Sequence, residues 1–174
     1  MTAARVFRKR AGGFTLVELM VVVALVAILG TIAVPGFRDL LLNQRLASNT
    51  GEFVAAVNLA RSEAMKRSQK VRLLPRDQDW TNGWEVMTTD DDPEVLRSFD
   101  PLRAGVEVDA GTGNGFKKSI IFDANGFSKG SAGCLTFKAH TGRRSSVVLP
   151  MSGRPTVCDP DKRGDCGGST CNEG

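Results

Sequence analysis

The sequence predicts an α+β fold, in which a long N-terminal helix packs on a small antiparallel β-sandwich-like domain. Apolar residues run almost unbroken from Phe14 to Val34, and apolar positions then recur at helical spacing to about Lys70. From Val71 onward, short β-branched or alternating runs are separated by Gly, Asn, Asp and Pro. The 174 residues suffice for one such domain and an appendage.

The first 13 residues are short and basic and end in Gly12-Gly13. Four positive charges fall in this segment: Arg5, Arg8, Lys9 and Arg10. Of 23 basic residues, 23 − 4 = 19 remain against 19 acidic ones, so the net charge of +4 lies entirely in the segment. Bulk charge therefore does not indicate nucleic-acid binding, which would need a local patch.

Residues 14–36 are predicted to form a transmembrane helix. The apolar stretch from Phe14 to Val34 would be about 31 Å long as a helix, enough to cross a bilayer core. The preceding positive residues predict that the N-terminus stays in the cytoplasm and that the rest of the chain lies outside. No small-residue cleavage site follows the stretch, which argues against a secretory signal. Pro35-Gly36 is expected to kink the helix.

Glu18 is out of place in this apolar stretch, because a carboxylate in hydrocarbon costs roughly 2.5–3.5 kcal/mol on insertion scales. One explanation is local. Thr15 and Glu18 have the spacing of a capping box, which would start the helix near Thr15. The other explanation is a positive partner outside the chain, and the residues alone leave both open.

Residues 37–70 are predicted to form an amphipathic helix that lays its apolar face on a sheet. The predicted face consists of Leu42, Leu46, Phe53, Val57, Ala60 and Ala64. Glu63 and Arg67 have the spacing of a favourable ion pair on one helix.

Residues 71–158 are predicted to form the β-rich domain, as two small packed sheets or one strongly bent sheet, with the helix on one side. Its expected strands are VRLL, GWEVMTT, EVLRSF, GVEVDA, KSIIFDA, CLTFKA, SSVVLP and RPTVC. Trp80 and Trp84 flank a turn signal and are expected at the edge of the core. Asp90, Asp91 and Asp92 are expected at a solvated hairpin tip, and residues 159–174 form a polar C-terminal tail.

The composition gives little support for a metal site or catalysis. Cys134, Cys158, Cys166 and Cys171 include no C-x-x-C pair, and His140 is the only histidine. An even cysteine count beside a membrane segment predicts disulfides, with three pairings possible. The loop containing Asp159, Asp161, Gly164 and Asp165 resembles a calcium site, but Arg163 stands where an oxygen ligand is needed. No nucleophile or phosphate-binding motif occurs, so no enzyme activity, cofactor or metal is predicted.

GGFTLVELMVVVALVAILGTIAVPGF, at residues 12–37, resembles the N-terminus of a type IV prepilin. The resemblance implies that a prepilin peptidase removes leader residues 1–13 by cutting after Gly13 and then methylates Phe14. It also implies a role for Glu18 in assembly, where its carboxylate meets the N-terminal amine of a neighbouring subunit. An unpaired buried charge costs several kcal/mol, so such pairing would favour one axial register.

LARSEAMKR, WTNGWEVMTTDDD, IIFDANGFSKG and SGRPTVC are similar to stretches of the minor pilins of the FimT/FimU/GspH type. That resemblance supports a Cys134–Cys158 disulfide, which would leave Cys166–Cys171 in the tail. Some FimT-type pilins bind DNA through a basic GRxR motif. Here Gly153-Arg154-Pro155-Thr156 lacks the second arginine, so Arg143, Arg144 and Arg154 are weak candidates for DNA binding.

The resemblance therefore implies a minor type IV pilin, a structural subunit that primes or caps pilus assembly and supports twitching motility. The alternatives are a type II secretion minor pseudopilin and a pilus-tip DNA-binding pilin for natural transformation. The expected partners are other minor and major pilins, prepilin peptidase and the inner-membrane assembly platform. The expected location is the inner membrane, with one span and a periplasmic C-terminal domain, and then the pilus.

Overall fold

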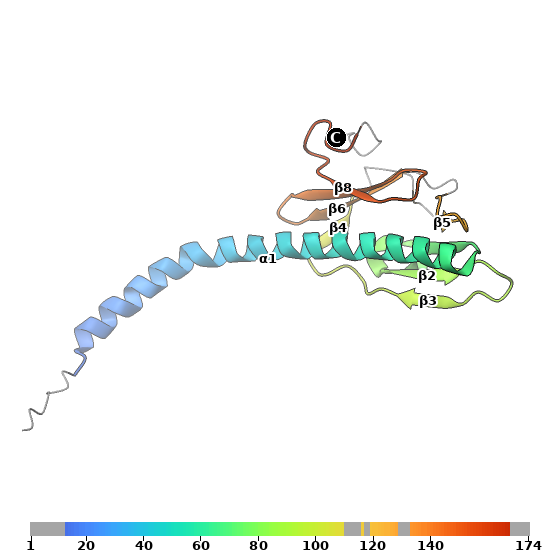
Figure 1. Cartoon of the computed structure of the whole chain (residues 1–174). Helices are drawn as coiled ribbons and strands as arrows, with labels where there is room; N and C mark the ends of the chain where they lie inside the picture. The colour runs from blue at the N-terminus through green and yellow to red at the C-terminus, as the bar shows by residue number, and fades with distance from the viewer. Residues whose placement is uncertain (1–12, 110–115, 117–118, 129–132, 168–174) are drawn as a thin grey trace, which may run out of the picture. The chain divides into compact units, whose positions relative to one another are not determined.

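The computed structural model describes residues 13–109, 116, 119–128 and 133–167 of the chain (Figure 1). Leader residues 1–12 and tail residues 168–174, including Cys171, lie outside this part. The chain divides into an N-terminal unit, Met1–Arg38, and a C-terminal unit, Asp39–Gly174.

Helix α1, Leu16–Arg67, begins in the N-terminal unit and supplies the long helix of the C-terminal unit. No single helix of the described residues meets the length and hydropathy criteria for a membrane span. Leu16–Thr31 and Gly36–Arg67 meet them together, as a pair bent at the break between them. The break contains Pro35, where the sequence predicted a kink, since proline lacks the amide that continues the helical hydrogen bonds.

Helix α1 ends at Arg67, slightly before the predicted end at Lys70. Ser68 adopts a left-handed backbone with φ of 53°. This turns the chain so that the amide of Gln69 donates to the Ala64 carbonyl at 3.2 Å. The bond satisfies a carbonyl that the helix end leaves open, and the chain can then enter its first strand at Val71.

The described residues of the β-rich part form eight strands, which match the eight predicted runs. One antiparallel sheet has the order β3-β2-β1-β5, and the other has the order β4-β6-β7-β8. The bounds in the first sheet are β1 Val71–Pro75, β2 Trp84–Thr88, β3 Val95–Ser98 and β5 Ile120–Phe122. In the second sheet they are β4 Val106–Val108, β6 Gly133–Ala139, β7 Arg144–Leu149 and β8 Thr156–Cys158. Short 3-10 turns η1, Arg76–Gln78, and η2, Trp80–Asn82, join β1 to β2.

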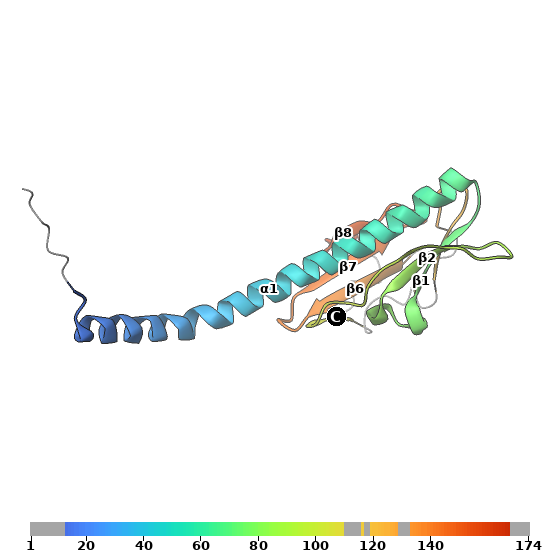
Figure 2. The same cartoon turned by 90° about the horizontal axis from the view of Figure 1, so that it is seen from below.

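The predicted α+β fold class is confirmed, with two sheets rather than one bent sheet. Figures 1 and 2 show the C-terminal half of α1 running along both sheets. The helix buries Leu46, Phe53, Val57, Ala60 and Ala64 of its predicted face against them. The predicted Glu63–Arg67 ion pair is present at 2.8 Å.

Phe53 of α1 stands at the centre of the core. Its ring lies 5.4 Å from the ring of Trp80 and 5.3 Å from that of Trp84, both edge to face, and 5.7 Å from Phe137 of β6. The expectation that the two tryptophans lie at the core edge was wrong. Trp80 is buried because its indole N–H donates to the Phe116 carbonyl at 2.7 Å, which removes the penalty of burying that donor.

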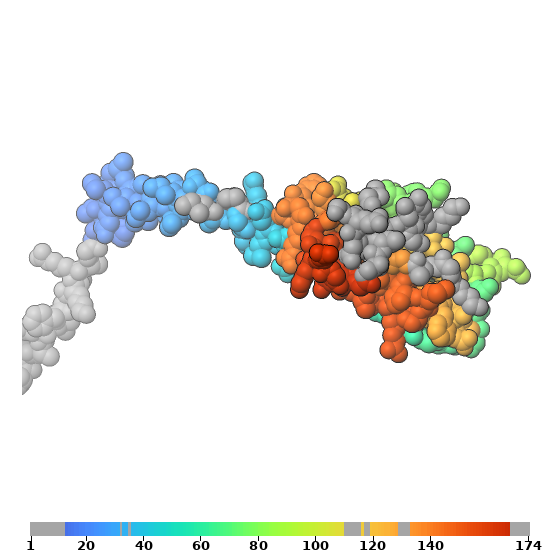
Figure 3. Space-filling model, turned by 90° about the horizontal axis from the view of Figure 1, so that it is seen from above, coloured from blue at the N-terminus to red at the C-terminus, as the bar shows by residue number. Residues whose placement is uncertain are grey.

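Strand β6 is buried on both of its faces. Phe137 and Ala139 point into the core, whereas Cys134 and Thr136 belong to the opposite face and are also fully buried. On that outer face the hydroxyls of Thr136 and Ser146 share a hydrogen bond of 2.7 Å. In Figure 3 the C-terminal residues, coloured red, lie against the orange strands of this sheet.

Candidate processing and assembly site

The start of α1 has the geometry of a capped helix. Gly13, Phe14 and Thr15 precede the helix, and the amide of Glu18 donates to the Thr15 hydroxyl oxygen at 3.2 Å. The amide of Leu19 donates to the Thr15 carbonyl at the same distance. Thr15 is therefore the N-cap, and the carboxylate of Glu18 belongs to the first helical turn, where the helix dipole favours negative charge.

Gly13 is exposed, and nothing in the described structure requires a glycine there. A Cβ added at Gly13 would meet none of the described atoms within 4 Å. The described structure therefore has room for a larger residue at this position. A glycine lets another protein approach the backbone closely.

The apolar side chains of the N-terminal unit are exposed, both before Glu18 and along the helix beyond it. Phe14 and Leu16 are 70% and 73% exposed, and exposure remains high along the following turns. No residue in the described part of the chain forms an ion pair with Glu18. An exposed apolar helix, whose carboxylate has no ion pair within the described structure, is suited to a membrane or to a bundle of helices.

The three arginines predicted as DNA contacts do not form one patch. Arg143 lies in the β6–β7 turn, whereas Arg154 lies in the β7–β8 turn, beyond the far end of β7. Six residues of β7 place these turns roughly 20 Å apart. Arg143 and Arg154 therefore lie at opposite ends of the second sheet, although they are close in the sequence.

Arg144 is committed to bonds within the chain. Its Nε donates to Oδ1 of Asp161 at 2.9 Å, Nη2 also contacts this oxygen, and Nη1 lies 3.3 Å from Oδ2 of Asp109. The hydrogen bond from Arg144 lowers the pKa of the Asp161 carboxyl, and the same bond raises the pKa of the guanidinium. Arg144 therefore ties the C-terminal loop to the sheet, and its charge is neutralised there.

The disulfide pairing supported by the resemblance was wrong. Cys158 is bonded to Cys166, with their Cα atoms 5.2 Å apart, and Cys134 is disulfide-bonded as well. Strand β7 lies between the strands that carry Cys134 and Cys158. Two strand spacings are roughly 9.6 Å, beyond the roughly 6.8 Å that a disulfide spans between Cα atoms.

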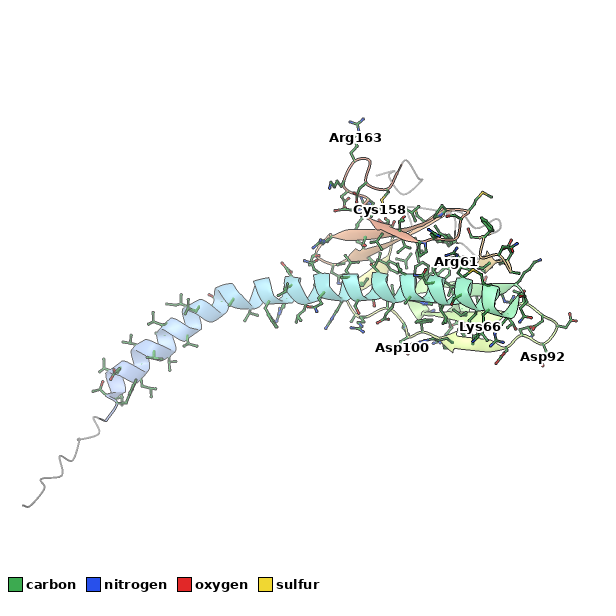
Figure 4. All side chains as sticks on the ribbon, in the orientation of Figure 1. Arg61, Lys66, Asp92, Asp100, Cys158 and Arg163 are labelled. Carbon is green, nitrogen blue, oxygen red and sulfur yellow. A yellow bond between two sulfur atoms is a disulfide. The ribbon has the colours of Figure 1, made fainter. Side chains whose placement is uncertain are left out.

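The acidic residues of the C-terminal loop organise the loop itself. Asp165 accepts the Asp159 amide at 2.8 Å, and Asp159 accepts the Asp161 amide at 3.0 Å. Within the described ranges no group of three His, Cys, Asp or Glu residues is placed to hold a metal ion. Figure 4 shows Arg163 at the outer tip of this loop.

Three of the stretches that carry the family resemblance meet at one junction, which the sequence did not predict. Arg61 of α1 donates from Nε to the Gly126 carbonyl at 2.9 Å. A Cβ at Gly153 would lie 2.2 Å from that same oxygen. The Ser128 amide donates to the Met151 carbonyl at 3.0 Å, so this junction joins the helix, the loop after β5 and the β7–β8 turn. The signal in the sequence was the glycine in each of ANG and SGR. These two residues, Gly126 and Gly153, both adopt a positive φ.

The fold and the helix start together define a pilin-like subunit, with an apolar helix that begins after a glycine and a domain of two small sheets on its second half. Two family models match the chain. The model described as type II transport protein GspH matches residues 49–153, and the prokaryotic N-terminal methylation motif matches residues 8–34. The chain belongs to the GspH family and carries the N-terminal methylation motif of type IV pilin-like proteins.

Individual relatives agree with this assignment. The chain is 28% identical over 144 residues to the type IV major fimbrial protein FimA of Dichelobacter nodosus, covering 76% of each chain. Its fold is similar to that of the type IV minor pilin FimU of Pseudomonas aeruginosa. The TM-score is 0.59 at 20% identity, over 71% of this chain and 96% of that one. It is also similar to the minor pseudopilin EpsH of the Vibrio cholerae type 2 secretion system, with a TM-score of 0.52 at 12% identity, over 68% and 99% of the two chains.

Proposed function

We propose that this chain is a minor type IV pilin that primes or caps pilus assembly. It is made as a prepilin and held in the inner membrane by a single span, residues 14–36, with its C-terminal unit in the periplasm. Prepilin peptidase cuts between Gly13 and Phe14 and methylates Phe14. The assembly platform then moves the subunit into a filament with other minor and major pilins, where it supports twitching motility as a structural subunit.

The observation that carries the proposal is the carboxylate of Glu18, which has no ion pair within the described structure and lies in the first turn of an exposed apolar helix. Cutting after Gly13 would create a positive amine at Phe14, four residues before Glu18. This offset corresponds to about 6 Å of helix rise. A neighbouring helix displaced by about that length presents its amine to Glu18, and the pairing removes the cost of an isolated charge among apolar side chains.

Capping by Thr15 complements this pairing. The cap fixes where the helix begins, so the carboxylate has a defined position relative to the new amine. Capping alone does not call for a charged side chain, since glutamine reaches back to the cap in the same way. The charge is what the neighbouring amine requires.

A minor pseudopilin of a type II secretion system is the second candidate, favoured by the match of residues 49–153 to the GspH model. It would use the same cut, the same helix and the same carboxylate in a periplasmic filament. Complementation separates the two: the pilin proposal expects the gene to restore pili to a strain that lacks its own minor pilin of this kind. Restoration of protein secretion instead would favour the pseudopilin.

A DNA receptor at the pilus tip has less support, because Arg143 and Arg154 lie at opposite ends of β7 and Arg144 is paired. A mobility-shift assay with the processed chain over a salt series tests this function. We expect no shift that depends on these three arginines. A shift at low salt that is lost when all three become alanine would restore DNA binding as a function.

Intact mass of the chain extracted from membranes tests the processing step. The expected mass lacks residues 1–13 and carries one additional methyl group. Gly13→Leu should leave the leader attached because a side chain blocks close approach to the scissile backbone, whereas Gly12→Ala should still be cut. Retention of the leader in the unaltered chain when the peptidase is present, or a cut beyond Val34, would contradict the proposal.

A further inference from the structure

A groove runs between α1 and the edge strand β3, in the C-terminal unit. Ala55, Asn58, Leu59 and Ser62 line its helix side, and Arg97 and Phe99 line its strand side. Its volume is about 520 Å³, and it continues past Leu59 and Arg97 into a second hollow toward the C-terminal end of α1. We refer to it as the α1–β3 groove. Its walls are largely apolar and the described structure leaves it open.

The charges of the second hollow neutralise one another. Glu63 pairs with Lys66 at 3.5 Å and with Arg67 at 2.8 Å, and Arg67 also pairs with Glu94 at 3.0 Å. Two carboxylates and two cations leave no net charge. Arg97 is different, because none of the described residues forms an ion pair with it. The α1–β3 groove therefore carries one unmatched positive charge beside an apolar wall.

Arg97 is held in position although its side chain donates no hydrogen bond to any of the described residues. Its guanidinium carbon lies 5.1 Å from the centre of the Phe99 ring, and Phe99 stacks on Trp84 of the core, with ring centres 5.9 Å apart. Stacking on an aromatic ring anchored in the core restricts the side chain before any partner arrives. A restricted arginine with free donors beside an apolar surface is the type of residue that contributes most at protein interfaces.

The chain itself contains a segment with the complementary chemistry. At the start of the C-terminal unit, Leu40 and Leu41 of α1 are 60% and 40% exposed, and Asp39 beside them is exposed and has no ion pair within the described structure. We infer that the α1–β3 groove is the docking site for Asp39 and Leu40 of a second copy of this chain. Leu40 covers the wall at Leu59 and Phe99, and the carboxylate of Asp39, next to it on the helix, pairs with Arg97.

The contact requires two copies that are displaced along the helix axis. Leu40 and Leu59 are 19 residues apart on α1, so the displacement is about 28 Å. The contact extends the proposed assembly role with a second surface, on the outside of the folded domain.

Photo-crosslinking in assembled filaments tests the contact. The full chain is expressed with prepilin peptidase, the assembly platform and the partner pilins, with p-benzoylphenylalanine at position Leu40, as a mixture of isotopically light and heavy copies. We expect light-to-heavy crosslinks to peptides that contain Leu59 or Phe99. Crosslinks to lipid, to another protein or to a different surface of the second copy would overturn the inference, as would the absence of light-to-heavy crosslinks.

Charge reversal tests the ion pair separately. Arg97→Asp and Asp39→Arg should each lower the yield of this crosslink about five-fold, and the double variant should regain most of it, since the pair is restored with opposite polarity. Arg163→Asp and Asp92→Arg, at exposed loop tips, are the matched controls and should leave the yield unchanged. No recovery in the double variant would contradict the pairing.

These measurements distinguish a failure of the α1–β3 inference from a failure of the proposed function. Cutting and methylation are followed by mass, and assembly through Glu18 is followed by recovery of the chain in filaments. If both persist while the crosslink from Leu40 maps elsewhere, the α1–β3 inference fails and the minor pilin proposal stands. If the leader is retained with the peptidase present, the minor pilin proposal itself fails.

Discussion

The two units of this chain differ in whether their apolar side chains are exposed or buried. In the N-terminal unit Phe14, Leu16 and the following apolar residues are exposed, and Glu18 has no ion pair within the described structure. In the C-terminal unit Phe53, Trp84 and Phe137 are fully buried in a shared aromatic core. The C-terminal unit builds a core of its own, whereas the apolar side chains of the N-terminal unit are left for a membrane or for other subunits.

This difference predicts that stability depends on the C-terminal unit, and that processing and assembly depend on the N-terminal unit. Substitutions in the C-terminal unit should change the free energy of unfolding, whereas substitutions in the N-terminal unit should change processing or assembly and leave that free energy unaltered. Trp80 and Trp84 are the only tryptophans, the chain has no tyrosine, and both lie in the C-terminal unit. Tryptophan fluorescence during urea unfolding therefore reports on that unit alone.

The largest effect is expected from Phe53→Ala. The substitution empties the centre of the aromatic cluster and should lower the free energy of unfolding by about 4 kcal/mol, as for other large-to-small changes in cores. Phe37→Ala is the matched control, because Phe37 is exposed in the N-terminal unit. A comparable loss for both variants in urea unfolding would remove the distinction between the units.

Gly153→Ala should cost about 3 kcal/mol, from a positive φ combined with a clash. The residue has φ of 75°, and an added Cβ would lie 2.2 Å from the Gly126 carbonyl oxygen. Gly142 has φ of 90° with open space around it, so Gly142→Ala carries only the conformational cost of about 1–2 kcal/mol. Equal losses in urea unfolding would show that the junction with Gly126 does not matter.

Removing the Cys158–Cys166 bond by the double change Cys158→Ser, Cys166→Ser should cost about 2.5 kcal/mol for a loop of this length. Peptide mapping checks the pairing directly. Cleavage at Lys162 and Arg163 leaves the two cysteines in separate peptides that only their disulfide joins. Finding Cys158 joined to Cys134 instead would contradict the structure.

The smallest effect is expected from Arg144→Gln, at most about 1 kcal/mol, because the pair with Asp161 is partly exposed to solvent. The bond lowers the pKa of Asp161 from its ordinary 3.8, so the pair contributes fully above that pH. Its contribution is lost as the pH falls from about 3.8 through the lowered pKa. The stability difference between the two proteins should therefore vanish in acid, and a difference that grows in acid would contradict this account.

The fold class could be predicted from the sequence because it depends on local patterns. The apolar spacing of Leu46, Phe53 and Val57 gave the helix face, and alternating runs bounded by Gly and Pro gave all eight strands. The kink at Pro35 could be predicted because proline lacks the backbone amide that continues the helical hydrogen bonds. In the N-terminal unit the candidate site is contiguous in the sequence. Thr15 and Glu18 could therefore be proposed from the residue pattern, and Gly13 from the resemblance to prepilins.

What failed depended on the order of the strands, which local patterns do not encode. The Cys134–Cys158 pairing was wrong because β7 separates the two strands, and Arg143 and Arg154 could not form one patch because β7 separates their turns. The α1–β3 groove was missed for the same reason. Its two walls are about 40 residues apart in the chain and meet only because β3 is the edge of the first sheet.

The most direct test of the central claim is the amount of Glu18→Gln that enters filaments, measured beside Glu18→Ala and Thr15→Ala in cells that express the full set of partner pilins. Glutamine can make the side-chain hydrogen bond of a capping box but carries no charge, so we expect Glu18→Gln to fail in assembly as severely as Glu18→Ala. Unfolding of the C-terminal unit should be unchanged in both. Thr15→Ala should retain most of its assembly. If Glu18→Gln enters filaments as efficiently as the unaltered chain, the carboxylate serves the helix start alone and pairing with a neighbouring amine does not drive assembly.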